Sequence, residues 1–244
     1  MLKRILPLLI ISTVIFACNE NSRKVDVKSV NKSGLADEVQ TEKVEKIDTL
    51  LFGNLDVKNL PKEIKFEGKI NNSSTWKDKE GEHISFTTET GQYISKKFKH
   101  EEYNEGSDAE VFGYHFIKVK TDKEYKLVWK INDYILDCNV DIEASFIKNT
   151  FQITDLDQNG IAEIWMMYKT VCHGDVSPFT MKVIMHDGAV KYSMRGTNKV
   201  QPAENEFIGG EYTFDKNFKN GPDLFLKFAQ DLWNKNILQN WEED

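Results

Sequence analysis

The sequence is poor in the residues and motifs that mark common catalytic sites. It has three cysteines and five histidines in 244 residues, and no two histidines have the spacing of zinc ligands. A Gly-rich phosphate loop ending in Gly-Lys-Ser/Thr and a Gly-x-Ser-x-Gly turn are both missing. The adjacent Cys172 and His173 would point to opposite faces of a strand, which argues against a nucleophile and its base. We therefore expect a protein that is not an enzyme, although two carboxylates from distant positions would leave no motif.

Aromatic residues are missing between Phe16 and Phe52. Residues 18–49 are instead rich in Lys, Glu, Asp, Ser and Asn, and such a composition cannot bury enough apolar surface to offset the entropy of ordering. We interpret this stretch as a flexible polar tether. Aromatic residues return after it, and residues 50–244 are numerous enough for a single globular domain with its own core.

No apolar run is long enough to cross a bilayer, which takes about 20 residues. The run Ile5–Phe16 follows two basic residues and has the length of the apolar core of a secretory signal. It leads into Ile-Phe-Ala-Cys at residues 15–18, which resembles a lipobox, although Phe is bulkier than the usual residue. The sequence thus predicts a signal peptide at residues 1–17 and a lipid anchor on Cys18. The alternative is an ordinary cleaved signal with an incidental cysteine.

The charge balance is acidic, with 39 acidic against 32 basic residues. Removal of Lys3 and Arg4 with the signal would leave 30 basic residues and a net charge of −9. Nucleic acid and anionic lipid would repel so acidic a chain. We expect no nucleic-acid partner. We expect attachment through the acyl chains on Cys18, as an outer-membrane lipoprotein on its periplasmic or cell-surface face.

Two cysteines, Cys138 and Cys172, remain once Cys18 carries lipid. An even pair in an exported protein predicts a disulfide. Two buried free thiols are the alternative, and the distance between the two Cα atoms decides between them.

Apolar periodicity predicts a β-rich α+β fold, in which antiparallel hairpins form a sheet with a C-terminal amphipathic helix packed on it. In one strand Tyr125, Leu127, Trp129 and Ile131 alternate with other residues and are expected to face the core. The expected hairpins comprise residues 110–131, residues 180–194 around Asp187-Gly188, and, more weakly, residues 84–98 around Thr90-Gly91.

The C-terminal region changes to helical spacing after Pro222, with Asp223 in or near the N-cap. We expect its apolar stripe to pack on the sheet, and the alternative is a stripe that binds a partner protein. The stripe comprises Leu224, Phe225, Phe228, Leu232, Trp233 and Ile237.

One segment, residues 155–163, has the pattern of a calcium-binding loop. Oxygen-bearing side chains fall at positions 1, 3, 5 and 9, and Gly160 at position 6 permits a sharp turn between ligands. An all-oxygen set of this kind suits Ca²⁺ better than Mg²⁺. The predicted ligands are Asp155, Asp157, Asn159, the backbone carbonyl of Ile161, and Glu163.

The loop departs from an EF-hand, because position 12 is Met166 and its flanks have the pattern of strands. It resembles the strand-flanked, Asp-rich calcium loops of extracellular repeat proteins, which need a further ligand from elsewhere. Asp141, Glu143 and Asp175 are candidate donors. The alternative is a polar turn without an ion, since Asp, Asn and Gly favour turns unaided.

Residues 153–194 also carry a family resemblance. The run Ile-Thr-Asp-Leu-Asp-Gln-Asn-Gly-Ile-Ala-Glu-Ile-Trp is followed by Cys-His-Gly-Asp-Val-Ser-Pro at 172–178 and Met-Arg-Gly at 194–196. Together they resemble a family of lipoproteins from Bacteroidetes-type bacteria described as surface-polysaccharide biosynthesis proteins. The resemblance implies a role in making or displaying lipopolysaccharide or capsule, and it carries no catalytic residue to this chain.

Together with this resemblance, the sequence indicates an accessory lipoprotein that supports the biosynthesis or display of surface polysaccharide as a non-catalytic binding or assembly factor. A second interpretation is an inhibitor module that captures a basic hydrolase such as lysozyme, because an acidic domain attracts a basic protein. A third is a hydrolase with a dispersed pair of carboxylates.

Overall fold

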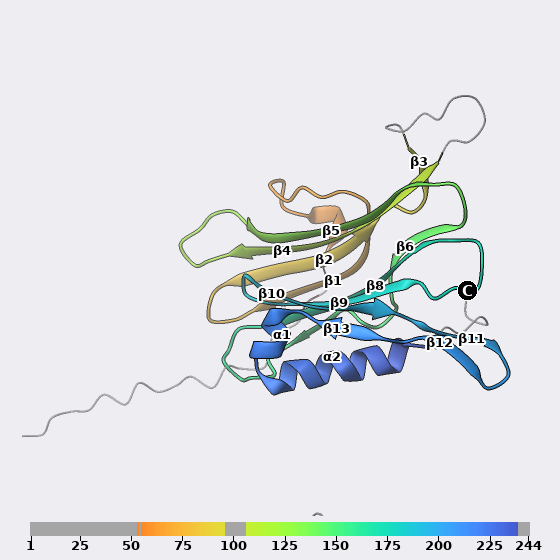
Figure 1. Cartoon of the computed structure of the whole chain (residues 1–244). Helices are drawn as coiled ribbons and strands as arrows, with labels where there is room; N and C mark the ends of the chain where they lie inside the picture. Colours follow the sequence, from red (N-terminus) through yellow and green to blue (C-terminus); the bar gives the residue numbers. More distant parts are fainter. Residues whose placement is uncertain (1–52, 54, 96–105, 239–244) are drawn as a thin grey trace, which may run out of the picture. The chain divides into compact units, whose positions relative to one another are not determined.

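The computed structural model describes residue 53, residues 55–95 and residues 106–238 (Figure 1). The expected signal peptide at residues 1–17, Cys18 and the tether at residues 18–49 lie outside this part of the chain. Within it, no helix is both long and apolar enough to cross a membrane. The fold is β-rich α+β, with antiparallel sheets and a C-terminal helix, as the sequence predicts.

The first sheet has β4 at its centre. One side of β4 pairs with β2 and then β3, β2 pairs with β1, and the other side of β4 pairs with β5. All these pairs are antiparallel. The strands are β1 (Lys69–Lys77), β2 (Glu82–Glu89), β3 (Tyr93–Ile94), β4 (Ser107–Lys118) and β5 (Lys126–Cys138), and a short 3-10 helix, η1 (Val57–Asn59), precedes them.

The second sheet runs in the order β13-β10-β9-β8, and the free side of β8 pairs with β6 and β7. A separate hairpin joins β11 and β12. The strands are β6 (Ile142–Phe146), β7 (Gln152–Thr154), β8 (Glu163–Cys172), β9 (Thr180–Asp187), β10 (Val190–Thr197), β11 (Lys199–Ala203), β12 (Glu206–Gly209) and β13 (Tyr212–Phe214), and the helices are α1 (Lys216–Asn220) and α2 (Asp223–Asn236).

Two of the three predicted hairpins are confirmed. The strands β4 and β5 pair, and so do β9 and β10, which turn at Gly188 with a positive φ of 53°. The third is wrong, because β2 pairs with β1 and β4 while the short β3 pairs with the far end of β4. The strand β1 has the polar sequence KINNSSTWK, which lacks the apolar alternation that predicts a strand. Because β1 and β4 occupy the two edges of β2, the strand after Thr90-Gly91 cannot pair with β2 as a hairpin would require.

The predicted alternation of β5 holds at only two of its four positions. Trp129 and Ile131 are buried, but Leu127 is 53% exposed and Tyr125 precedes the strand. The register explains this, because His115 faces Trp129 whereas Phe116 faces Leu127, which leaves Val128 as an extra residue. A bulge of this kind breaks the two-residue period.

The second sheet has a buried core on each face. On one face Trp165, Met167 and Met185 pack against Phe225 and Trp233 of α2, and Figure 1 shows α2 lying along this sheet. The opposite face packs Ile164, Met166 and Ile184 against residues of the first sheet. The predicted packing of the C-terminal stripe on the sheet is confirmed for Phe225, Leu232 and Trp233, whereas Leu224 is 39% exposed. The N-cap is Pro222, and Asp223 lies next to it as the first residue of the helix.

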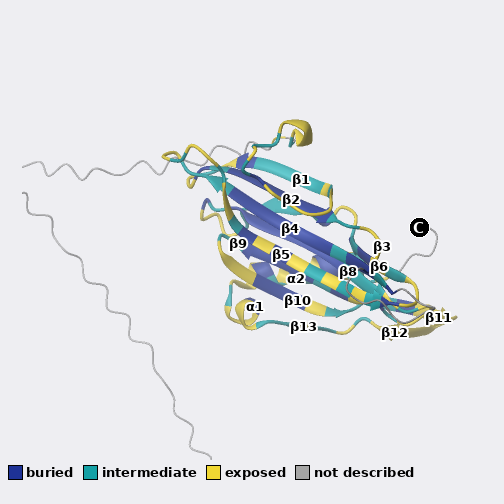
Figure 2. Cartoon of the chain, turned by 90° about the horizontal axis from the view of Figure 1, so that it is seen from above, coloured by how far each residue is buried: buried dark blue, intermediate teal, exposed yellow. Residues whose placement is uncertain are grey.

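The outer face of the first sheet has a third core, around Phe86, Phe112 and Tyr114, and Ile64 from the segment before β1 packs on it. As a result β2 and β4 are buried along most of their length, whereas β1 and β5 alternate or remain partly exposed (Figure 2). The layering holds the ends of the strands, and the turns between them, in fixed positions.

Candidate metal centre

The predicted calcium loop connects β7 to β8, which confirms that strands flank it. Thr154 and Glu163 face each other across this antiparallel pair. Within the loop, Gln158 and Gly160 have positive φ values of 57° and 77°. Glycine adopts such a backbone without steric cost, so Gly160 permits the sharp turn that the loop pattern predicts at this position.

Side-chain oxygens of the loop accept hydrogen bonds from its own amides. Both carboxylate oxygens of Asp155 accept from the Gly160 amide, at 3.3 and 3.2 Å. Asp157 accepts from the backbone and side-chain nitrogens of Asn159, at 3.1 and 2.9 Å. The Asn159 side-chain oxygen in turn accepts from the Ile161 amide at 2.7 Å. A carboxylate oxygen has more than one acceptor site, so these bonds leave capacity for a cation.

Glu163 is the buried member of the loop, with 0% exposure. Its carboxylate accepts from the Leu156 amide at 2.9 Å and from the Thr154 hydroxyl at 2.6 Å. Burial raises the pKa of Glu163, the charge of Asp157 adds to the rise, and the two hydrogen bonds oppose it. A buried carboxylate of this kind is stabilised by any cation that binds beside it.

Three of the five predicted ligands come together. Asp155, Asp157 and Glu163 each offer an oxygen, and these oxygens lie within 4.8 Å of one another. Because Ca²⁺ binds oxygen at 2.3–2.6 Å, two ligands of one ion can lie about 5 Å apart. The spacing fits calcium. The Asn159 side-chain oxygen accepts from the Ile161 amide within the loop. The roles of Asn159 and of the Ile161 carbonyl as ligands stay predictions.

The suggested extra donors lie at the wrong end of β8. Glu143 faces Val171 and forms an ion pair with Lys169, whereas the loop adjoins Glu163. The Asp141 carbonyl accepts from the His173 amide, and Asp175 pairs with the same histidine at 3.3 Å. At about 3.3 Å per strand residue, these groups are more than 20 Å from the loop.

Two other carboxylates, those of Asp187 and Glu80, lie nearer, and no pattern in the sequence indicates either of them. Asp187 faces Glu163 across the pair of β8 and β9. Burial raises the pKa of Asp187, and the charges of Asp157, Glu80 and Asp155 raise it further. Strand pairing, rather than spacing along the chain, brings these acidic groups together.

Lys79 is a cation of the protein itself beside the loop. Its ammonium donates to the Asn159 carbonyl at 2.5 Å, and its charge lowers the pKa of Asp187 against the effect of the carboxylates. It partly compensates the crowded negative charge and competes with any bound ion.

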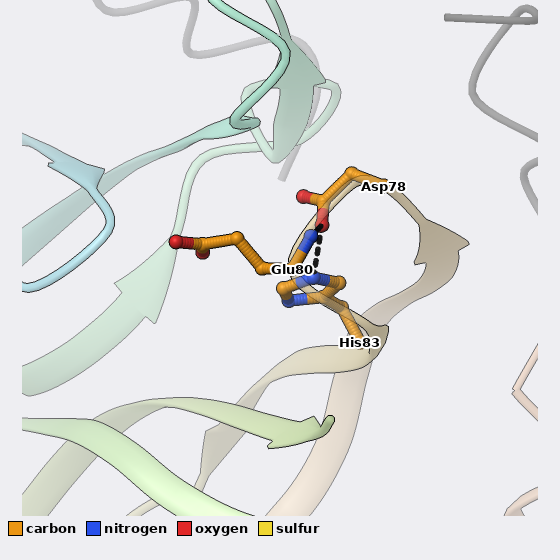
Figure 3. A group of neighbouring side chains, drawn as sticks. All are labelled: Asp78, Glu80 and His83. Carbon is orange, nitrogen blue, oxygen red and sulfur yellow. Dashed lines mark hydrogen bonds and ion pairs between the residues drawn. The ribbon is translucent and has the colours of Figure 1, made fainter. Parts of the chain in front are cut away.

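A second group of possible ligands comprises Asp78 and Glu80 from the turn between β1 and β2 and His83 from the start of β2 (Figure 3). The Asp78 carboxylate lies 2.7 Å from Nε2 of His83 and also accepts from the Glu80 and Gly81 amides. Burial opposes ionisation of Asp78, but His83 and the two amides outweigh it and lower the pKa. The three residues each offer one ligand atom within 4.8 Å of the others, but Asp78 and His83 already bind each other, and Glu80 extends to one side of that contact in Figure 3.

A buried histidine chain extends from this turn into the protein. Nδ1 of His83 lies 2.9 Å from Nε2 of His115, so both ring nitrogens of His83 are engaged. The rings of Trp76, His83 and His115 stack, and His186 stacks on Trp129 at 4.1 Å between ring centroids. This group holds the turn in place, and we assign it a structural role.

The two cysteines form a disulfide with a Cα–Cα distance of 5.9 Å, as predicted. It joins the end of β5 to the end of β8, and therefore one sheet to the other. The Cys172 thiol is consumed by this bond.

Comparison of the chain with protein-family models, with curated proteins and with solved structures finds no match.

Proposed function

We propose that this chain is a membrane-anchored lipoprotein that supports the production or display of surface polysaccharide as a non-catalytic binding or assembly factor. Its domain binds a structural Ca²⁺ through Asp155, Asp157 and Glu163. The observation that carries the metal is the grouping of three carboxylate oxygens within 4.8 Å at ligand spacing in the sequence. Asp187 and Glu80 add negative charge nearby.

The non-catalytic role is supported by what the reactive side chains do. Cys172 is bonded to Cys138, and His83 is held between Asp78 and His115. Asp133, which lies on β5, is bound by Lys182 and by the hydroxyl of Tyr168 at 2.9 Å. The disulfide and the contacts of Asp133 join strands of the two sheets, whereas the contact of His83 with His115 joins β2 and β4 of the first sheet. Such contacts suit a rigid scaffold.

The glycan role and the anchor rest on the sequence, namely the motifs of residues 153–196 and the lipobox before Cys18. A deletion strain, complemented with the wild type or with Cys18→Ala, tests both on a surface-glycan gel. We expect a lost or shortened ladder that only the lipidated form restores. An unchanged ladder would overturn the glycan role. Stoichiometric binding of lysozyme to the acidic domain would then favour the inhibitor interpretation.

A further inference from the structure

A cavity of about 340 Å³ lies where the turn between β1 and β2 meets the segment that follows β4. Its walls comprise Lys77, Asp78, Gly81, Glu82 and residues 118–120 and 122. This volume lies within the range of small-molecule sites. The cavity is distinct from the carboxylate group of the calcium loop.

Two lysines share one carboxylate in this cavity. The ammonium groups of Lys77 and Lys118 lie 2.8 and 2.7 Å from the two oxygens of Glu82. Hydrogen bonds from Lys118 and Lys77 lower the pKa of Glu82 to about 2. Glu82 therefore stays charged, and the three groups together keep a surplus positive charge.

The other carboxylates of the cavity are already used. The Asp78 side chain is 1% exposed and turned toward His83, and Asp122 pairs with Lys126 at 2.9 Å. Lys120 is exposed and has no ion-pair partner among the described residues. The lining holds three lysines and three carboxylates. Since Asp78 and Asp122 are held by His83 and Lys126, Lys120 and the two lysines that share Glu82 are the groups left to attract an anion.

The cavity is also held in shape. The Lys118 ammonium lies 5.0 Å from the centre of the Tyr125 ring, and the Tyr125 hydroxyl lies 3.4 Å from Glu82. At Gly81 a Cβ atom would lie 2.5 Å from the Lys118 carbonyl, so only glycine allows this close approach of the two segments. The charged groups are positioned before any ligand arrives, which lowers the cost of binding.

We propose that this cavity binds a sugar unit that carries an oxyanion, either a carboxylate or a phosphate. The lysines attract the anion, while the acceptor sites that the lysines leave open on the oxygens of Glu82 and Asp122 accept from sugar hydroxyls. The identification of the ligand as a sugar rests on the proposed glycan role, whereas the preference for an anion rests on the cavity alone.

The test is a titration of the purified full chain, followed by NMR, with galacturonic acid, glucose 6-phosphate and glucose. We expect at least one acidic sugar to bind at least 10-fold more tightly than glucose, and the stronger one identifies the anion as carboxylate or phosphate. We expect Lys120→Met to weaken binding at least 3-fold. We expect the double variant Lys118→Met/Lys120→Met to weaken it at least 10-fold.

The matched control is Lys227→Met, which removes the same charge from an exposed position on α2. Its affinity should equal that of the wild type. The proposal is overturned if neither acidic sugar binds, if glucose binds equally well, or if the control weakens binding as much as Lys120→Met does.

The result is separable from the glycan role. Lysine-dependent binding of an acidic sugar, together with an unchanged surface-glycan ladder, would support the cavity as an anion site and contradict the proposed glycan role. A lost ladder without binding would retain the function and overturn the cavity as its ligand site.

Discussion

Two turns of this protein combine Asp, Glu and Gly, and they differ in how their carboxylates are compensated. In the turn between β1 and β2, Asp78 is bound by a histidine and two backbone amides. In the loop between β7 and β8, Asp155, Asp157 and Glu163 lie together, and Lys79 is a cation that reaches the loop. The first turn is complete without a ligand, whereas the second carries excess negative charge that a cation would stabilise.

The pKa directions show the same contrast. The pKa of Asp78 is lowered, because its hydrogen bonds and the charge of His83 outweigh burial. Burial and neighbouring charge raise those of Glu163 and Asp187. Acidic residues near a glycine therefore indicate a metal site only when their partners do not already satisfy them.

The largest expected effect is acid destabilisation of the histidine group. Burial lowers the pKa of His115 and of His186 to about 3, below the value of about 6.5 in an unfolded chain. Below pH 6.5 the unfolded chain binds protons that the folded chain does not, so the free energy of unfolding decreases as the pH is lowered. Between pH 7 and pH 5 we expect a loss on the order of 4 kcal/mol from the two histidines.

Urea unfolding at pH 7, 6 and 5 measures this loss. His186→Phe keeps a ring on Trp129 but does not titrate, so its pH dependence should be about half as steep. An identical slope in the variant and the wild type would show that His186 takes up no proton on unfolding.

Removal of the Asp78 carboxylate should have the next largest effect. Asp78→Ala leaves His83 and two turn amides without their acceptor, and we expect a loss of about 3 kcal/mol. Asp78→Asn keeps an oxygen acceptor and should lose less. Both variants should keep the calcium response, measured as the change in Tm between calcium and chelator. A lost response would show that the two turns act as one site.

In the calcium loop, Glu163→Ala and Glu163→Gln separate structure from charge. The alanine leaves the buried Leu156 amide and Thr154 hydroxyl unpaired, and should cost about 2 kcal/mol even in chelator. The glutamine keeps an acceptor, so its Tm in chelator should stay near that of the wild type. Both should lose most of the calcium response. A full response in Glu163→Gln would remove this residue from the ligand set.

The smallest expected effect is that of Lys79→Met. Loss of a competing cation should raise calcium affinity several-fold. The free energy of unfolding in chelator should change by less than about 1 kcal/mol, because the Lys79 side chain is exposed. Calorimetric titration with Ca²⁺ measures the affinity, and Lys227→Met is the matched control. Weaker binding in Lys79→Met would contradict the competition between Lys79 and the ion.

Local patterns predicted much of the fold. Asp187-Gly188 gave the hairpin of β9 and β10, and the three- and four-residue spacing after Pro222 gave α2. The strand β1 was not predicted, because its polar residues are stabilised by partners on another strand that local patterns do not reveal. Asn72, for example, donates to the Thr87 hydroxyl from both its backbone and side-chain nitrogens, at 3.2 and 3.1 Å.

The candidate site divides in the same way. Asp155, Asp157 and Glu163 were predictable because ligand spacing within one loop is a local property. Asp187 and Glu80 were not, since strand register and the meeting of two turns bring them near. The contact between His83 and His115 joins residues 32 positions apart, and neither strand pattern indicates it.

The most direct test of calcium binding compares the melting of the wild type and Asp157→Ala in calcium and in chelator. At a calcium concentration 100-fold above Kd, binding stabilises the folded state by about 2.7 kcal/mol, or roughly 5 to 10 °C in a domain of this size. We predict this rise for the wild type and none for Asp157→Ala. Identical wild-type melts in calcium and in chelator would show that the loop is a polar turn without an ion.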